Sequence, residues 1–69
     1  MKKYCKTMTE IDGQRWYGID LVSAVDLTVL LSAEAVTTDF DRAYRIVRWL
    51  NWVGLEPALF ESFVAAVRD

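Results

Sequence analysis

The dipeptide Asp12-Gly13 constrains the fold of this chain more than any other feature of its sequence. A two-residue type I′ hairpin turn needs positive φ at both central positions, and Asp followed by Gly tolerates that backbone well. Pairing outward from the turn sets Ile11 opposite Gln14, Glu10 opposite Arg15, Met8 opposite Tyr17, Lys6 opposite Ile19 and Tyr4 opposite Leu21. The sequence therefore predicts an N-terminal β-hairpin with a defined register.

This register separates the hairpin into two faces, because side chains alternate along a strand. The predicted core face carries Tyr4, Met8, Tyr17, Ile19 and Leu21. Glu10 and Arg15 form an opposite-charge pair at its turn end. The other face carries Cys5, Thr7, Thr9, Trp16 and Asp20. Trp16 is thus expected to point away from the core.

Residues 22–26 are expected to form a loop, and residues 27–36 then allow two interpretations. Apolar side chains alternate with polar ones from Leu27 to Val36, which is typical of a strand. A helix competes, because several of these residues are good helix formers. The alternation and the lack of a capping residue favour a third strand.

Two helices are expected in the second half of the chain. Thr38 is the predicted N-cap of the first, with Asp41 three residues later, and this helix should run through Trp52 and end at Gly54. Pro57 suits the first position of the second helix. That helix is expected to be largely buried because apolar residues dominate it: Leu59, Phe60, Phe63, Val64, Ala66 and Val67.

This order of elements predicts one α+β domain over residues 1–69, a three-stranded antiparallel meander followed by a helical hairpin packed on one face (βββαα). The chain is 54% hydrophobic and 26% charged, which favours a folded protein with surplus apolar surface, as in a homodimer. It holds one cysteine and no histidine. We therefore expect no internal disulfide, metal or cofactor.

Charge and hydropathy limit the cellular setting and the partners. Neither a secretion signal nor an apolar run of the roughly 18 residues needed to span a bilayer is present, so a cytoplasmic protein without a membrane partner is expected. The net charge is −2, and residues 17–41 carry five acids and no base. This charge argues against duplex-DNA binding. The acidic segment can instead face the arginines of a second copy.

Those arginines surround two tryptophans on the first predicted helix. At about 100° per residue, a predicted core arc collects Phe40, Ala43, Tyr44, Val47 and Leu50. Trp49 and Trp52 lie nearly opposite, among Arg42, Arg45 and Arg48. Arg45 and Trp49, like Arg48 and Trp52, are four residues apart, a spacing that predicts cation–π stacking on a helix surface.

Roughly the last three quarters of the chain also match a known pattern. Its features are Tyr17-Gly18-Ile19-Asp20 in a strand, Thr37-Thr38-Asp39 opening a helix, Leu50-Asn51 near its end, and Glu56-Pro57 followed by Leu59-Phe60 and Val64. From Tyr17 onward the chain resembles a domain of unknown function found mainly in Gram-positive anaerobes. That family tends to place serine where Glu56 stands. The resemblance implies a fold and a bacterial or phage-like source, and it supplies no catalytic residue or substrate.

No arrangement of residues predicts catalysis, since Cys5 has no histidine to activate it and the acids at positions 39 and 41 suit a helix N-terminus. The sequence favours a non-enzymatic protein–protein interaction module. Its predicted partner-binding residues are Arg42, Arg45, Arg48, Trp49, Trp52 and Trp16. A homodimer is the simplest version of this hypothesis, and another protein is the second. Single-stranded nucleic-acid binding and a phage-type inhibitor of a host protein complex are the alternatives.

Overall fold

A computed structural model describes all 69 residues. The elements are β1 (Lys2–Ile11), β2 (Gln14–Ser23), β3 (Val29–Thr37), α1 (Phe40–Val53), a short 3-10 helix η1 (Pro57–Leu59) and α2 (Phe60–Val67). The predicted α+β architecture with βββαα order is confirmed. The ambiguous segment 27–36 is mostly strand.

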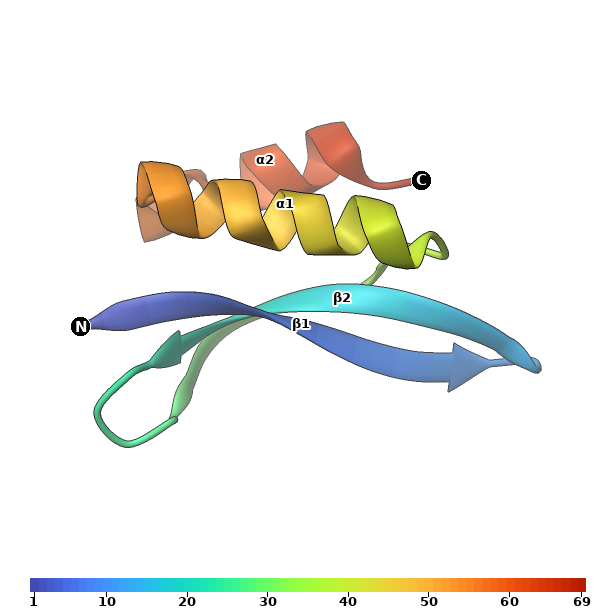
Figure 1. The fold of residues 1–69 in the computed structure, drawn as a ribbon, viewed down its shortest axis with the longest axis horizontal. Helices are drawn as coiled ribbons and strands as arrows, with labels where there is room; N and C mark the ends of the chain where they lie inside the picture. Colours follow the sequence, from blue (N-terminus) through green and yellow to red (C-terminus); the bar gives the residue numbers. More distant parts are fainter.

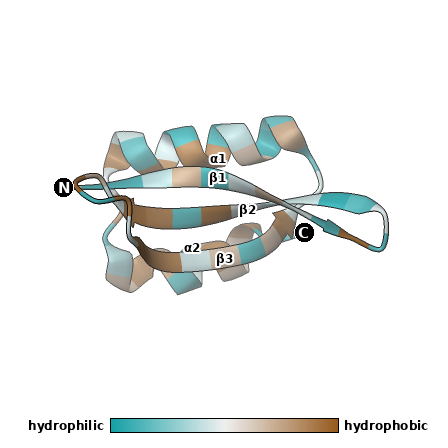
Figure 2. Cartoon of the chain, turned by 90° about the horizontal axis from the view of Figure 1, so that it is seen from below, coloured by the Kyte–Doolittle hydropathy of each residue, from teal (hydrophilic) through white to brown (hydrophobic).

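The three strands form one antiparallel sheet in the order β1-β2-β3, and both helices lie on the same side of it (Figure 1). The predicted hairpin register is confirmed at every pair, from Ile11 opposite Gln14 to Tyr4 opposite Leu21. Asp12 and Gly13 have φ values of 51° and 79°, as a type I′ turn requires. Seen from the uncovered side of the sheet, α1 runs along the β1 side and α2 lies behind β3 (Figure 2).

The pairing of β2 with β3 is irregular in a way that the sequence does not reveal. Tyr17 lies opposite Thr37 but Ile19 lies opposite Ala33, so two steps along β2 match four along β3. Ala35 takes a φ of 52° within this irregularity. The alternation predicted from Leu27 therefore breaks: Ala35 is only partly buried, whereas Val36 is fully buried. The predicted phase of this strand is wrong beyond the irregularity.

Gly18 makes this irregularity sterically feasible. A Cβ atom at this position would lie 2.4 Å from the Ala33 carbonyl oxygen and 2.8 Å from Thr7 Oγ1. The strands thus approach one another more closely than any side chain at position 18 would allow.

The core lies between the sheet and the two helices. It is built from Tyr4, Ile19, Leu21, Ala33, Val36, Leu50, Phe60 and Val64. Met8, predicted for this core, is instead 58% exposed. The hairpin extends past the first turn of α1, so no helix covers its tip (Figure 1). On β1 the last core-facing side chain that is partly buried is that of Lys6, whose ammonium group lies 4.4 Å from the ring centre of Phe40.

The ends of α1 are set by local chemistry. The N-cap is Asp39, whose side chain accepts a hydrogen bond from the Arg42 backbone N–H, and not Thr38 as predicted. Thr37 explains the shift by one residue, because its hydroxyl accepts from the Asp39 backbone N–H and fixes that residue in extended conformation. Gly54 ends the helix in left-handed conformation, as predicted.

The buried face of α1 is rotated from the predicted arc. Ala43 and Leu50 are buried, but Phe40 and Tyr44 are half exposed. Ile46 packs against the core in their place, because α2 lies beside α1 on that side. The second helix is less buried than predicted: Phe60 and Val64 are buried, while Leu59 and Ala66 are exposed.

The two outer strands have differently covered edges. At β3, the Arg68 guanidinium donates to the carbonyl oxygens of Glu34 and Ala35, and the Asp69 backbone N–H donates to Val36. At β1, only Tyr4 is covered: its N–H donates to the Asn51 side-chain oxygen at 2.7 Å, and its carbonyl accepts from the Asn51 amide at 2.9 Å.

Candidate protein-binding surface

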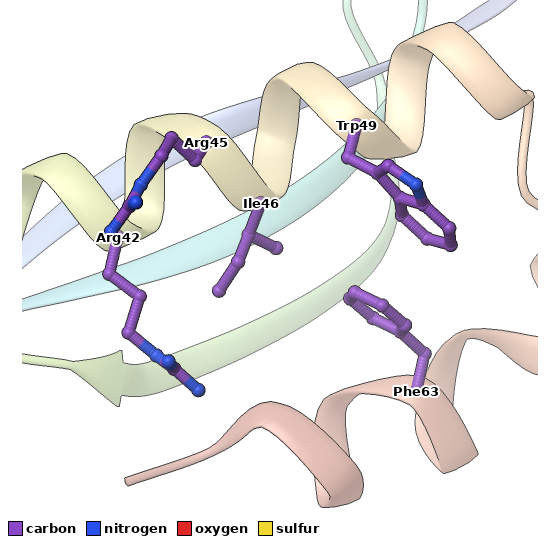
Figure 3. A pocket seen from close by; sticks show the side chains of 5 residues that line it. All are labelled: Arg42, Arg45, Ile46, Trp49 and Phe63. Carbon is purple, nitrogen blue, oxygen red and sulfur yellow. The ribbon is translucent and has the colours of Figure 1, made fainter.

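An open groove runs between α1 and α2 on the side of the helices away from β1 (Figure 3). It has a volume of about 440 Å³ and is lined by Arg42, Arg45, Ile46, Trp49 and Phe63. A second hollow of about 350 Å³ adjoins it and is lined by Arg45, Arg48, Trp49 and Trp52. Since the two share Arg45 and Trp49, we describe them together as the Arg/Trp surface.

Trp49 forms the apolar wall between the two hollows. Its indole stacks on the Phe63 ring of α2, with ring centres 5.4 Å apart and planes at 11° (Figure 3). This contact leaves the residue 45% exposed. The sequence pointed to Trp49 but missed Phe63, which looked like one more apolar residue of a buried helix. No signal in the sequence pairs the two, because their contact depends on how α2 packs beside α1.

Trp52 lies in the last turn of α1 and is the most exposed aromatic residue of the molecule, at 83%. It stacks on no other ring. Its predicted place on the wet side of the helix is confirmed. An indole left bare in this way represents a large apolar area that a bound partner could remove from water.

Arg42 is already engaged within the chain. Its Nη2 donates to the Val67 carbonyl at 2.9 Å, and its Nε lies 3.6 Å from Asp69 Oδ1. The Nε atom is itself buried and makes no hydrogen bond. The charge of this arginine therefore holds the C-terminal residues against α1 and is less available to a partner than those of its neighbours.

Arg45 and Arg48 keep their charges uncompensated. Arg45 Nε makes one long contact of 3.4 Å to the Asp41 carbonyl, and the only ion pair of the structure is Arg42 with Asp69. The predicted cation–π stacking of these arginines on the tryptophans is wrong; the cation–π contacts instead join Lys6 to Tyr17 and Phe40. Trp49 turns toward Phe63 because burying apolar area there outweighs a weak exposed cation–π contact.

Trp16 does not join this surface. It alternates with Tyr17, whose side chain faces the helices, so Trp16 points to the uncovered side of the sheet. The acidic segment also contributes to that side, where Asp20 accepts a hydrogen bond from the Ser32 hydroxyl at 2.6 Å. The sheet thus separates Trp16 from the other predicted partner-binding residues.

Reactive groups elsewhere are few. Cys5 is a free, partly buried thiol, and no three His, Cys, Asp or Glu side chains lie together in a way that could hold a metal ion. Burial raises the pKa of the Tyr4 hydroxyl, which donates to the Leu55 carbonyl at 2.8 Å. Hydrogen bonds from the Thr28 hydroxyl and backbone N–H lower the pKa of Asp26.

Comparison with known proteins identifies no relative of this chain. The chain matches no protein-family model, no curated protein sequence and no solved structure. No helix has the length and apolar character needed to cross a membrane.

Proposed function

We propose that this chain is a small non-enzymatic protein-binding module whose Arg/Trp surface takes an acidic segment of another protein that also carries a large apolar side chain. The observation that carries this proposal is the placement of the bare indole of Trp52 beside two uncompensated guanidinium groups, next to a groove with an apolar wall.

The chemistry of the surface defines what would bind. An apolar side chain entering the groove would contact Ile46, Trp49 and Phe63. Carboxylates beside it would meet Arg45 and Arg48, which can bind them through two parallel hydrogen bonds. Tryptophan and arginine are also the residue types that most often dominate binding energy at protein interfaces.

The same surface is poorly suited to bind its own copy. One stripe of α1 carries, in order, Asp41, Arg45, Arg48 and Trp52. An antiparallel contact centred on the middle of this stripe would set Arg45 of each copy opposite Arg48 of the other. A contact with the acidic side of the sheet would be head-to-tail and would build open chains of molecules. A different protein therefore fits this surface better than a second copy.

Single-stranded nucleic acid is the second candidate, because Trp52 could stack on a base while the arginines follow phosphates. The net charge of −2 and the presence of only two uncompensated arginines on this surface favour protein instead.

Nuclear magnetic resonance offers a direct test, since the three tryptophans give three indole N–H signals. Random displayed peptides are first selected on the immobilised protein. We expect the enriched peptides to combine a large apolar residue with neighbouring Asp or Glu. Titrating one of them should shift the indole signals of Trp49 and Trp52 and leave that of Trp16 unchanged.

Two charge-reversal variants provide the matched comparison. Arg48→Glu should abolish the shifts, whereas Lys3→Glu, an equal change at an exposed position of β1, should leave them intact. Equal responses of all three indoles, or equal binding by both variants, would contradict the proposal. Indole shifts of the same pattern with oligothymidylate at low salt, but not with peptides, would assign the surface to nucleic acid.

A further inference from the structure

Part of the β1 edge is free to pair with another strand. In an antiparallel ladder, alternate residues direct their N–H and C=O groups to opposite sides of the strand. Tyr4 directs both of its groups away from β2, toward Asn51. Lys6, Met8 and Glu10 share this orientation because they are two, four and six residues further along β1. No group of this chain bonds to their outward side.

The free segment has clear limits. Asn51 covers the edge at Tyr4, and the turn at Asp12-Gly13 ends the strand on the other side. The free edge is therefore Lys6 to Glu10. Exposed edges of this kind are sites of pairing with another chain unless a protein covers or charges them.

We propose that this edge pairs with the same edge of a second copy, antiparallel and about a two-fold axis at Met8. This register sets Lys6 opposite Glu10 of the second copy, Met8 opposite Met8, and Thr7 opposite Thr9. Opposite charges and β-branched residues across neighbouring strands stabilise such pairs. Neither ionic residue forms an ion pair within its own chain, and the Lys6 ammonium group lies over the Phe40 and Tyr17 rings with no carboxylate beside it.

The charges also select this register over its neighbours. A shift of the axis to Lys6 would place two lysines opposite each other, and a shift to Glu10 would place two glutamates opposite each other. Axes at Thr7 or Thr9 would set Met8 against one of the charged residues. Only the axis at Met8 gives every charge an opposite partner.

A second observation supports the same contact. Phe40, Tyr44 and Asn51 fall on one stripe of α1, four and seven residues apart, and Asn51 reaches the outer edge of β1. The stripe therefore faces the region where the second copy would lie. Phe40 and Tyr44 are 50% and 51% exposed in the single chain, although their spacing predicts burial. With the axis at Met8, where the helical layer ends, the uncovered hairpin tip of the second copy would lie beside the Phe40 end of this stripe and reduce the exposure of its rings.

The first test is the assembly state of the full chain, measured by sedimentation equilibrium over a range of concentrations. We expect a dimer. Amide hydrogen exchange should show protection that increases with concentration at Lys6, Met8 and Glu10, but not at Thr7 and Thr9, which already bond to β2.

Charge exchange tests the register itself. Glu10→Lys, which alters an exposed residue at the hairpin tip, should weaken the dimer about tenfold or more, because two opposite-charge pairs become like-charge pairs. Lys6→Glu should do the same. An equimolar mixture of the two variants should dimerise again, since every charge then faces its opposite. Glu56→Lys, an equal change far from this edge, is the control, and circular dichroism verifies the fold of each variant.

A chain that stays monomeric at about 1 mM would overturn this inference. Dimerisation that survives Glu10→Lys unchanged, or variants that do not associate when mixed, would overturn it as well. Loss of the dimer on Arg48→Glu but not on Glu10→Lys would place self-association at the Arg/Trp surface instead. Because the two surfaces share no residue, failure here leaves the proposed protein-binding function standing.

Discussion

The two edges of this sheet differ in how far their backbone groups are hydrogen-bonded by the rest of the chain. The second half of the β3 edge is covered by the end of its own chain, where Arg68 and Asp69 bond to the carbonyl groups of residues 34–36. The β1 edge is closed only at Tyr4, by Asn51, and is otherwise open. The chain thus covers part of the β3 edge with its own last residues but leaves Lys6 to Glu10 of β1 uncovered, which is the asymmetry expected if β1 is where two copies meet, as proposed.

The irregular pairing of β3 with β2 depends most strongly on Gly18, and Gly18→Val is expected to have the largest effect. The new side chain would collide with the Ala33 carbonyl and the Glu34 backbone, so β2 and β3 could not keep their irregular pairing. We expect a loss of about 3 kcal/mol or more, measured by urea unfolding. Gly13→Ala, which meets no atom but has a φ of 79°, should cost about 1 kcal/mol. Equal effects of the two substitutions would show that backbone conformation, and not close approach, explains Gly18.

Local chemistry is the part of this fold that the sequence predicts. Asp12-Gly13 defines the turn and therefore the register, and Gly54 defines the end of α1. Met8 and Ala35 could not be placed correctly, because burial at each depends on distant parts of the chain. Met8 is exposed where the helical layer ends, and Ala35 takes its conformation from the strand opposite it.

The candidate surface was predictable to a similar extent. Helical spacing placed Trp49, Trp52 and three arginines on one side of α1, and in the structure both tryptophans and all three arginines line open hollows. Helical spacing could not indicate that Arg42 holds the C-terminus or that Phe63 stacks on Trp49, because both contacts join α1 to later parts of the chain.

Asn51→Leu tests how the β1 edge is held at Tyr4. The substitution leaves the N–H and C=O of Tyr4 without their partner in a partly buried position. We expect a loss of about 2 kcal/mol in thermal or urea unfolding. Arg48→Leu, three residues earlier on α1 and without a hydrogen bond or ion pair, is the control and should cost less than about 0.5 kcal/mol. A loss of similar size in both variants would mean that Asn51 does not fasten the strand.

Tyr4→Phe tests the second contact that holds Tyr4, the hydrogen bond that its hydroxyl donates to the Leu55 carbonyl. Loss of the hydroxyl bond to Leu55 should cost about 1 kcal/mol at neutral pH. Burial raises the pKa of this hydroxyl, so the folded state holds its proton more tightly than the unfolded chain does. Its contribution is therefore intact below the unfolded value of about 10 and declines as the pH rises above it. Unfolding curves at increasing alkaline pH should show a decline that is steeper in the unmodified chain than in Tyr4→Phe.

Arg68→Ala is expected to have the smallest effect, because it frees the carbonyls of Glu34 and Ala35 at an edge that water can reach. We expect a loss of about 0.5 kcal/mol in urea unfolding, since water replaces most of what the guanidinium provided. The informative readout is assembly. With the second half of this edge uncovered as well, the variant should form species larger than a dimer, because the whole β3 edge would then be free at each end of the combined sheet. Arg68→Ala could form no larger species while Glu10→Lys abolishes the dimer. The irregular pairing of β3 would then be enough to prevent pairing at that edge, and the difference between the two edges would not depend on Arg68.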